Sequence, residues 1–221
     1  MAIGNLTALQ ERVLLVLAEI RPAWTLTGGA ALVGFHTLHR ETRDLDLFFR
    51  GERTVGILAG AVREALERAG LAVSVLQTGT TLLRMDVRDD ASSVILDLVA
   101  DPTPIAEHPQ RVDLGAVSIL IDTPHQLLVN KLCALLSRSE LRDLVDVREL
   151  VARGGDLTRA LADCPKQDGG FSPLTFGWSV REFPVERLGA VYGMSAGDIE
   201  ALVRFRDDLV ARVVAEARPP E

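Results

Sequence analysis

The sequence predicts an α+β fold, with a mixed β-sheet and flanking helices over residues 1–122 and a helical half over residues 123–221. Two observations predict this division. Several segments between residues 72 and 121 read as short strands separated by polar or Gly/Pro residues, whereas segments after residue 124 have helical spacing. Thr123-Pro124 marks the change, because proline is favoured in the first turn of a helix.

The first element expected is an amphipathic helix at Leu6–Ile20, with Thr7 as its N-cap. A short apolar strand at Trp24–Leu26 then runs into Gly28-Gly29, and Ala30–Leu38 reads as a helix. The order is therefore strand, glycine turn, helix. The later elements expected are a strand at Leu45–Phe49, a helix at Arg53–Ala69, strands at Ala72–Gln77, Thr81–Arg88, Ser93–Ala100 and Ala116–Ile121, and helices at Gln126–Leu136, Glu140–Ala152 and Ala196–Ala217.

Composition excludes several classes of protein. The chain has 24 Lys and Arg residues against 31 Asp and Glu, a net charge of −7, whereas proteins that coat nucleic acid usually have a basic surface. Apolar runs such as Val13–Ala18 are far shorter than the roughly 20 residues that span a bilayer. The first residues lack a basic region followed by an apolar segment, so we expect a cytoplasmic protein with no membrane contact.

Two carboxylates carry the strongest chemical signal. Alternate side chains of a strand share a face, so Asp44 and Asp46 project together while Leu45 and Leu47 point the other way. Adjacent carboxylates repel each other unless a cation lies between them. Mg²⁺, with Mn²⁺ as an alternative, is the natural candidate because it binds to one or two carboxylates together with substrate phosphates. Taken alone, the pair could equally be a solvent-facing stretch of strand.

The glycine pair upstream points to a phosphate. Gly28-Gly29 precedes an expected helix N-terminus, where free backbone N–H groups and the helix dipole bind anions. Glycine also lets the backbone approach a ligand closely. A tight turn would explain the glycines by themselves. The glycine turn followed by a strand with paired carboxylates favours a site for a metal ion and a triphosphate.

A third carboxylate would complete a cluster that holds two metal ions. Asp97 is the preferred candidate, because it interrupts an otherwise apolar strand, SVILDLVAD, where an unpaired carboxylate would be costly to bury. Asp86 in LLRMDVR is the competitor, and an exposed strand face would explain it as easily. We therefore expect Asp44, Asp46 and Asp97 to be metal ligands and catalytic residues.

The combined pattern resembles the AbiEii/AbiGii family of nucleotidyltransferase toxins, which function in abortive-infection and toxin–antitoxin systems of bacteria. The resemblance covers roughly residues 24–150, and no single piece of it is specific. The matching residues are Gly28-Gly29, Ala31-Leu32, His39-Arg40, Thr42, Asp44, Asp46, Asp97, Lys131, Arg138, Asp143 and Asp146.

This resemblance implies a polymerase-β-like fold, a nucleoside triphosphate (NTP) as donor, dependence on Mg²⁺, and a cognate antitoxin as a partner. It also implies that Lys131 and Asp143 lie near the active centre and have catalytic roles, with Arg138 as a phosphate contact. Arg40 is a further candidate for a phosphate contact because it lies just before the strand of Asp44 and Asp46, and a solvated loop is the alternative for it. Lysine usage supports Lys131 independently: 22 of the 24 basic residues are Arg, and a compact ammonium suits a phosphate. Helix-surface ion pairs are the alternative for Arg138 and Asp146.

The resulting hypothesis is a Mg²⁺-dependent nucleotidyltransferase that moves a nucleoside monophosphate from an NTP to an acceptor hydroxyl. Toxin relatives suggest RNA as the acceptor, for example a tRNA 3′ end, and the acidic charge permits a short end-on contact. A small antibiotic or a protein hydroxyl is the alternative acceptor. A protein of another class, which binds nucleotide or a partner without catalysis, is the second hypothesis.

Overall fold

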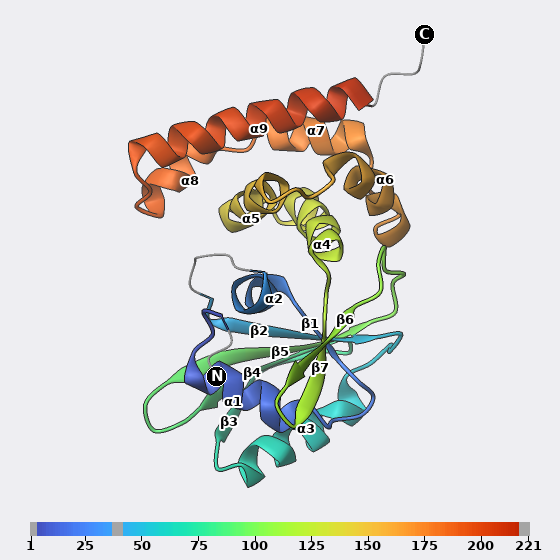
Figure 1. Ribbon diagram of the computed structural model, residues 1–221, viewed down its shortest axis with the longest axis vertical. Helices are drawn as coiled ribbons and strands as arrows, with labels where there is room; N and C mark the ends of the chain where they lie inside the picture. Colours follow the sequence, from blue (N-terminus) through green and yellow to red (C-terminus); the bar gives the residue numbers. More distant parts are fainter. Residues whose placement is uncertain (1–3, 37–41, 217–221) are drawn as a thin grey trace. The chain divides into compact units, whose positions relative to one another are not determined.

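The computed structural model describes residues 4–36 and 42–216 of the chain and divides into two compact units (Figure 1). The first unit contains the described residues up to Thr103 and the segment Glu107–Thr123. The second contains Pro104–Ala106 and the described residues from Pro124 onwards. The expected division into a domain over residues 1–122 and a domain over residues 123–221 stays a prediction.

A mixed seven-stranded sheet forms the first unit. Its strands are β1 (Thr25–Thr27), β2 (Asp44–Arg50), β3 (Ala72–Thr78), β4 (Leu82–Arg88), β5 (Ser93–Asp101), β6 (Gln110–Leu114) and β7 (Val117–Ile121). Their order is β3-β4-β5-β2-β1-β7-β6. Strands β2 and β5 pair in parallel, as do β1 and β7, and the other neighbours are antiparallel. The expected α+β fold with a mixed sheet is confirmed.

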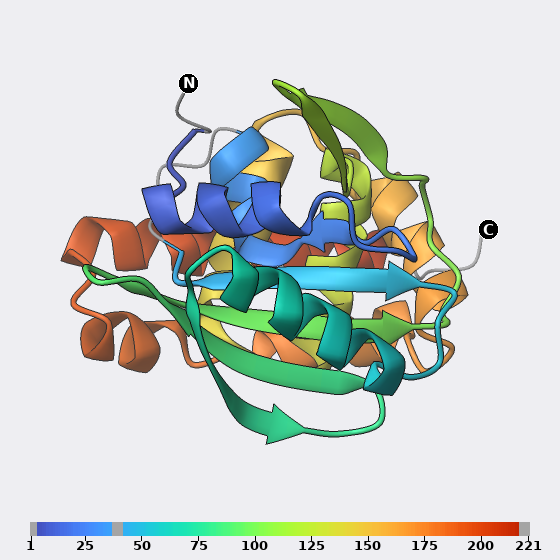
Figure 2. The same ribbon diagram turned by 90° about the horizontal axis from the view of Figure 1, so that it is seen from below.

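The core of this unit lies on one face of the sheet. Helices α1 (Ala8–Leu17) and α3 (Gly56–Arg68) cover this face, as Figure 2 shows from below. Leu45, Leu47 and Phe49 of β2 point into it and are fully buried. Burying each such side chain contributes about 1.5–3 kcal/mol. The alternation of these residues with Asp44 and Asp46 therefore fixes which face of β2 the carboxylates occupy.

Helix α2 (Gly28–Phe35) lies on the opposite face of the sheet (Figure 1). It begins at Gly28, two residues earlier than the sequence predicted, so the glycine pair forms the first turn of the helix and does not precede it. The prediction of a separate glycine turn was wrong because glycine at positive φ can itself start the helix directly after a strand. The expected end of this helix, beyond His36, lies outside the described residues.

The second unit is helical, as the sequence predicted. Its helices are α4 (Pro124–Ser137), α5 (Leu141–Ala152), α6 (Leu157–Gln167), α7 (Pro173–Arg181), α8 (Val185–Val191) and α9 (Ala196–Glu216). Ser139, with a φ of 51°, separates α4 from α5. Helix α4 packs on α5 and α6, and α9 packs on α7 and α8. None of the helices in the described residues is long and apolar enough to span a membrane.

Candidate active site

Three carboxylates lie next to one another on the face of the sheet on which α2 lies. Asp44 and Asp46 alternate with buried leucines along β2 and are partly exposed, as the sequence predicted. Asp97 of β5 is the in-register partner of Asp46 in the parallel β2–β5 pair, so both side chains project from the same face. We refer to Asp44, Asp46 and Asp97 as the acidic row. Sequence reasoning singled out all three residues, and the strand pairing brings them together.

Asp86, the competing candidate, lies one strand further from β2. It pairs with Ile95 of β5 and forms an ion pair with Arg88 of its own strand. Its carboxylate is therefore neutralised locally, and β5 separates it from Asp44 and Asp46. Asp97, the register partner of Asp46, therefore lies nearer to the β2 carboxylates than Asp86 does, and its role as third metal ligand stays a prediction.

Arg84 is a site residue that sequence reasoning missed. It is the antiparallel partner of Asp97, and its guanidinium contacts both carboxylate oxygens, Nε to Oδ1 at 2.8 Å and Nη2 to Oδ2 at 2.6 Å. Hydrogen bonding to Asp97 and the charge of Asp97, with the more distant charges of Asp44 and Asp46, raise the pKa of Arg84 above its ordinary value. The signal that could have found it is the position of an arginine opposite Asp97, which becomes visible once the register of β4 and β5 is known.

Gly28 lies directly against the acidic row. Its φ is 63°, and a Cβ atom at this position would collide with the carboxylate of Asp46. Thr27, the residue before it, pairs in register with Asp46, and its side chain does not cap the helix. The first N–H groups of α2, including that of Gly29, have no partner within the helix. A helix N-terminus without a side-chain cap and a pair of carboxylates thus lie next to each other, as an anion and its metal ion would require.

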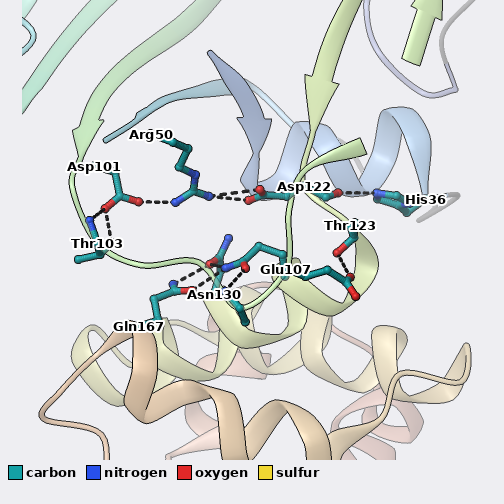
Figure 3. A network of polar contacts seen from close by, with 11 residues as sticks. His36, Arg50, Asp101, Thr103, Glu107, Asp122, Thr123, Asn130 and Gln167 are labelled. Carbon is teal, nitrogen blue, oxygen red and sulfur yellow. Dashed lines mark hydrogen bonds and ion pairs between the residues drawn. The ribbon is translucent and has the colours of Figure 1, made fainter. Parts of the chain in front are cut away.

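A second polar cluster at the far end of β2 was also missed. Arg50 lies between Asp101 and Asp122 and contacts both carboxylates, reaching the Asp122 oxygens at 2.9 and 3.2 Å (Figure 3). His36, just after α2, contacts the backbone oxygen of Asp122 at 3.0 Å. Burial of this imidazole lowers its pKa, against the opposing effect of Asp122. The cluster joins the ends of β2, β5 and β7 to α2, so we interpret it as a support for the strand that carries Asp44 and Asp46.

Four residues of the family pattern form an ion cluster inside the second unit. The Lys131 amino group lies 2.8 Å from carboxylate oxygens of both Asp143 and Asp146, and Arg138 contacts both oxygens of Asp143. Asp143 and Asp146 are fully buried, so the alternative of a helix-surface ion pair is wrong for Asp146. This alternative still stands for Arg138, whose side chain is 46% exposed. Burial raises the pKa of Asp143, but hydrogen bonds and charge from Arg138 and Lys131 outweigh this effect and keep it below its ordinary value. We call this set the buried ion cluster.

These contacts bear on the remaining predicted site residues. The ammonium of Lys131 is bound by two carboxylates, so a phosphate contact for Lys131 stays a prediction, as do the catalytic role of Asp143 and the phosphate contact of Arg138. Arg40 lies outside the described residues. Among residues 4–36 and 42–216, no group of three or more His, Cys, Asp and Glu side chains is arranged to hold a metal ion. Asp44 and Asp46 fit such an ion as a pair, and Asp97 faces Arg84.

Two solved structures are similar to this chain in fold. A putative nucleotidyltransferase from H. pylori is 17% identical, with 96% of each chain covered and a TM-score of 0.55. MenT4, a nucleotidyltransferase toxin from Mycobacterium tuberculosis, is 16% identical, with 92% of this chain and 82% of that chain covered and a TM-score of 0.62. No curated protein matches the chain. The fold is that of a nucleotidyltransferase.

A match to a family model shows which family the chain belongs to. The model described as "Nucleotidyl transferase AbiEii toxin, Type IV TA system" matches residues 11–187, most of the chain. The chain therefore belongs to the AbiEii family of nucleotidyltransferase toxins, and the resemblance noted in the sequence is confirmed. It is an enzyme of the nucleotidyltransferase class.

Proposed function

We propose that the chain transfers a nucleoside monophosphate from an NTP to an acceptor hydroxyl, with Mg²⁺ held by Asp44 and Asp46. The observation that carries the proposal is the contact of Gly28 with Asp46, because it places a helix N-terminus beside a partly exposed carboxylate pair. Mg²⁺ at this pair would offset the charge of the triphosphate as it reacts. Mn²⁺ has similar ligand preferences and would substitute for it.

Several elements around the acidic row have a part in the proposed reaction. The first turn of α2 binds triphosphate oxygens through its N–H groups, and the absence of a side chain at Gly28 leaves room beside Asp46. The acceptor oxygen forms a bond to the α-phosphorus, and its hydroxyl proton is released. The bond from the α-phosphorus to the oxygen that bridges the α- and β-phosphorus breaks, and pyrophosphate leaves. Four residues of the family pattern are proposed to assist the transfer: Lys131, Arg138, Asp143, and Arg40 before β2.

The experiment that tests this proposal uses α-labelled NTPs, Mg²⁺ and total RNA. Wild-type protein is expected to label an RNA acceptor, and Asp44→Ala is expected to abolish the labelling. Asp90→Ala is the matched control, since Asp90 is exposed in the turn between β4 and β5, away from the acidic row. Labelling that persists in Asp44→Ala, or that is equally lost in Asp90→Ala, would contradict the proposed site.

RNA is the acceptor that we favour, with a tRNA 3′ end as the simplest form. MenT4, which shares the fold, is a nucleotidyltransferase toxin, and the family belongs to type IV toxin–antitoxin systems. The net charge of −7 disfavours a long RNA footprint, so a short contact at an RNA end is proposed. Labelling of aminoglycosides, lincosamides or protein in place of RNA would identify one of the alternative acceptors.

A cognate antitoxin and a cytoplasmic location complete the proposal, because the family model describes the toxin of a type IV toxin–antitoxin system. Expression of the wild-type chain is expected to arrest growth, and cells that express Asp44→Ala are expected to grow normally. Growth arrest that survives the substitution would favour the second hypothesis, a protein that acts by binding nucleotide or a partner. An NTP that raises the thermal stability of the protein without being consumed would favour this second hypothesis as well.

A further inference from the structure

Arg84, Asp97 and Asp46 form one row across three neighbouring strands. Arg84 of β4 is the register partner of Asp97 on β5, and Asp97 is the register partner of Asp46 on β2. Register partners point to the same face of a sheet, so the Arg84 guanidinium lies on the face that carries the β2 carboxylates. Helix α2 begins on this face as well, because Gly28 lies directly against Asp46. Arg84 is therefore a cation on the face where the triphosphate is proposed to bind.

The contact with Asp97 engages one edge of the Arg84 guanidinium. Nε donates to Oδ1 at 2.8 Å and Nη2 donates to Oδ2 at 2.6 Å, and this bidentate geometry fixes the plane of the group. Nη1 carries two further N–H groups, which point away from the engaged edge because the guanidinium is planar. The Asp97 side chain is only 7% exposed, whereas that of Arg84 is 42% exposed. The pair is thus anchored at its buried carboxylate and accessible at its cation.

We propose that Arg84 binds an oxygen of the NTP triphosphate through Nη1, and that Asp97 is a positioning residue that orients the guanidinium. This inference rests on the proposed function, because it requires a triphosphate between the first turn of α2 and the acidic row. Guanidinium N–H groups match phosphate oxygens in geometry, and arginine keeps its positive charge in proteins. The pairing of β4 with β5 and of β5 with β2 brings Arg84 to the substrate.

Strand β4 carries a second arginine–carboxylate pair, which provides a matched control. Arg88 donates to Asp86 at 2.6 Å, and the Asp86 side chain is 7% exposed, as is that of Asp97. Arg88 is the register partner of Ser93, so it lies outside the row that contains Asp46. The two pairs therefore share their strand and their chemistry, and they differ in their position relative to the β2 carboxylates.

Calorimetric titration with Mn²⁺ and a non-hydrolysable NTP analogue tests the part of Arg84. The double variant Arg84→Met/Asp97→Asn removes one charge of each sign, so the net charge of the site is unchanged. We expect this variant to lose at least about tenfold in affinity for the analogue, the effect of one charge-assisted contact. Arg84→Lys keeps the charge but not the planar fork and is expected to lose less. Arg88→Met/Asp86→Asn is expected to stay within about twofold of the wild type.

The part of Asp97 is tested by a comparison of two backgrounds. If Asp97 orients the guanidinium, Asp97→Asn lowers the affinity at least about threefold in the wild type and has a smaller effect beside Arg84→Lys. A residue that binds the metal ion directly would give equal losses in both backgrounds, and this result would overturn the positioning role. Circular dichroism checks that every variant is folded.

The outcomes separate this inference from the proposed function. If the wild type does not bind the analogue, the proposed function and the inference both fall. If the wild type binds it and Arg84→Lys and Arg84→Met/Asp97→Asn bind it equally well, the part of Arg84 is overturned and the proposed function stands. Equal losses in the Arg84 variant and in Arg88→Met/Asp86→Asn would also overturn it, because the effect would then not depend on the position of the pair.

Discussion

The acidic row of the first unit and the buried ion cluster of the second are built from the same kinds of side chain in different proportions. The buried ion cluster has two carboxylates and two cations, and its carboxylates are fully buried. In the acidic row, Asp97 is paired with Arg84, and the other two carboxylates, Asp44 and Asp46, are partly exposed. Paired charges in the interior lose much of their stabilising effect when one partner is removed, whereas neighbouring carboxylates at an accessible face repel each other and can bind a cation.

The largest expected effect comes from the acidic row. Asp46→Asn is expected to lower the rate of nucleotidyl transfer by about a thousandfold or more, because it removes a proposed metal ligand. Its thermal stability is expected to be unchanged or higher, since a repulsion between neighbouring carboxylates is relieved. Label transfer and thermal unfolding are measured on the same preparation. A variant that loses activity only because it unfolds would break the comparison between the two regions.

The buried ion cluster is expected to respond in the opposite way. Lys131→Met leaves Asp143 and Asp146 buried without their shared cation and is expected to lower the free energy of unfolding by about 3–5 kcal/mol. Urea denaturation measures this loss. Lys166→Met is the matched control, since the Lys166 side chain is 68% exposed and its partner Asp163 keeps the contact with His125. Full stability of Lys131→Met together with lost NTP binding would show instead that Lys131 serves the substrate.

Gly28 tests the contact between α2 and the acidic row. Gly28→Ala is expected to destabilise the protein by about 1–3 kcal/mol, through its positive φ and the collision with Asp46, and to impair transfer. Gly51→Ala separates the two causes, because Gly51 also has positive φ but has no atom near a Cβ position. Unfolding and label transfer are compared for both variants. Equal activity in the two would mean that the space beside Asp46 has no functional role.

The smallest effect expected is a difference in pH dependence. The pKa of Asp143 is lowered in the folded state, so its ionised form contributes stability above the pKa of the unfolded chain, and this contribution is lost as pH falls through the lowered pKa. The stability of Asp143→Asn is therefore expected to fall less steeply than that of the wild type as the solution is acidified below about pH 4. Urea titrations at several pH values measure the slopes. Equal slopes of stability against pH for the two proteins would show that the Asp143 carboxylate does not contribute to the pH dependence.

Local patterns were sufficient for most elements of the sheet. The alternation of Asp44 and Asp46 with buried leucines predicted β2 and the face on which the carboxylates lie. Strand β6 was missed because Gln110–Leu114 is a largely exposed edge strand, and its sequence therefore lacks an apolar alternation. The start of α2 was placed two residues late because glycine is a poor helix former by propensity.

The site residues that depend on long-range pairing could not be predicted in the same way. Asp97 was identified as an anomaly in an apolar strand, but its place beside Asp46 follows from the β2–β5 register, which no local pattern specifies. Arg84 was overlooked for the same reason. The partners of Lys131 were part of the family pattern, yet their burial depends on how α5 packs against α4. The sequence therefore identified the residues of the site more reliably than it identified the cations that these residues bind.

Binding of the metal–nucleotide complex tests the central claim most directly. Calorimetric titration with Mn²⁺ and a non-hydrolysable NTP analogue is performed on the wild type, on Asp44→Asn/Asp46→Asn and on Asp86→Asn, which alters the same face of the sheet outside the acidic row. The account predicts that the double variant loses at least about a hundredfold in affinity and that Asp86→Asn stays within about twofold of the wild type. Undiminished binding by the double variant would contradict it.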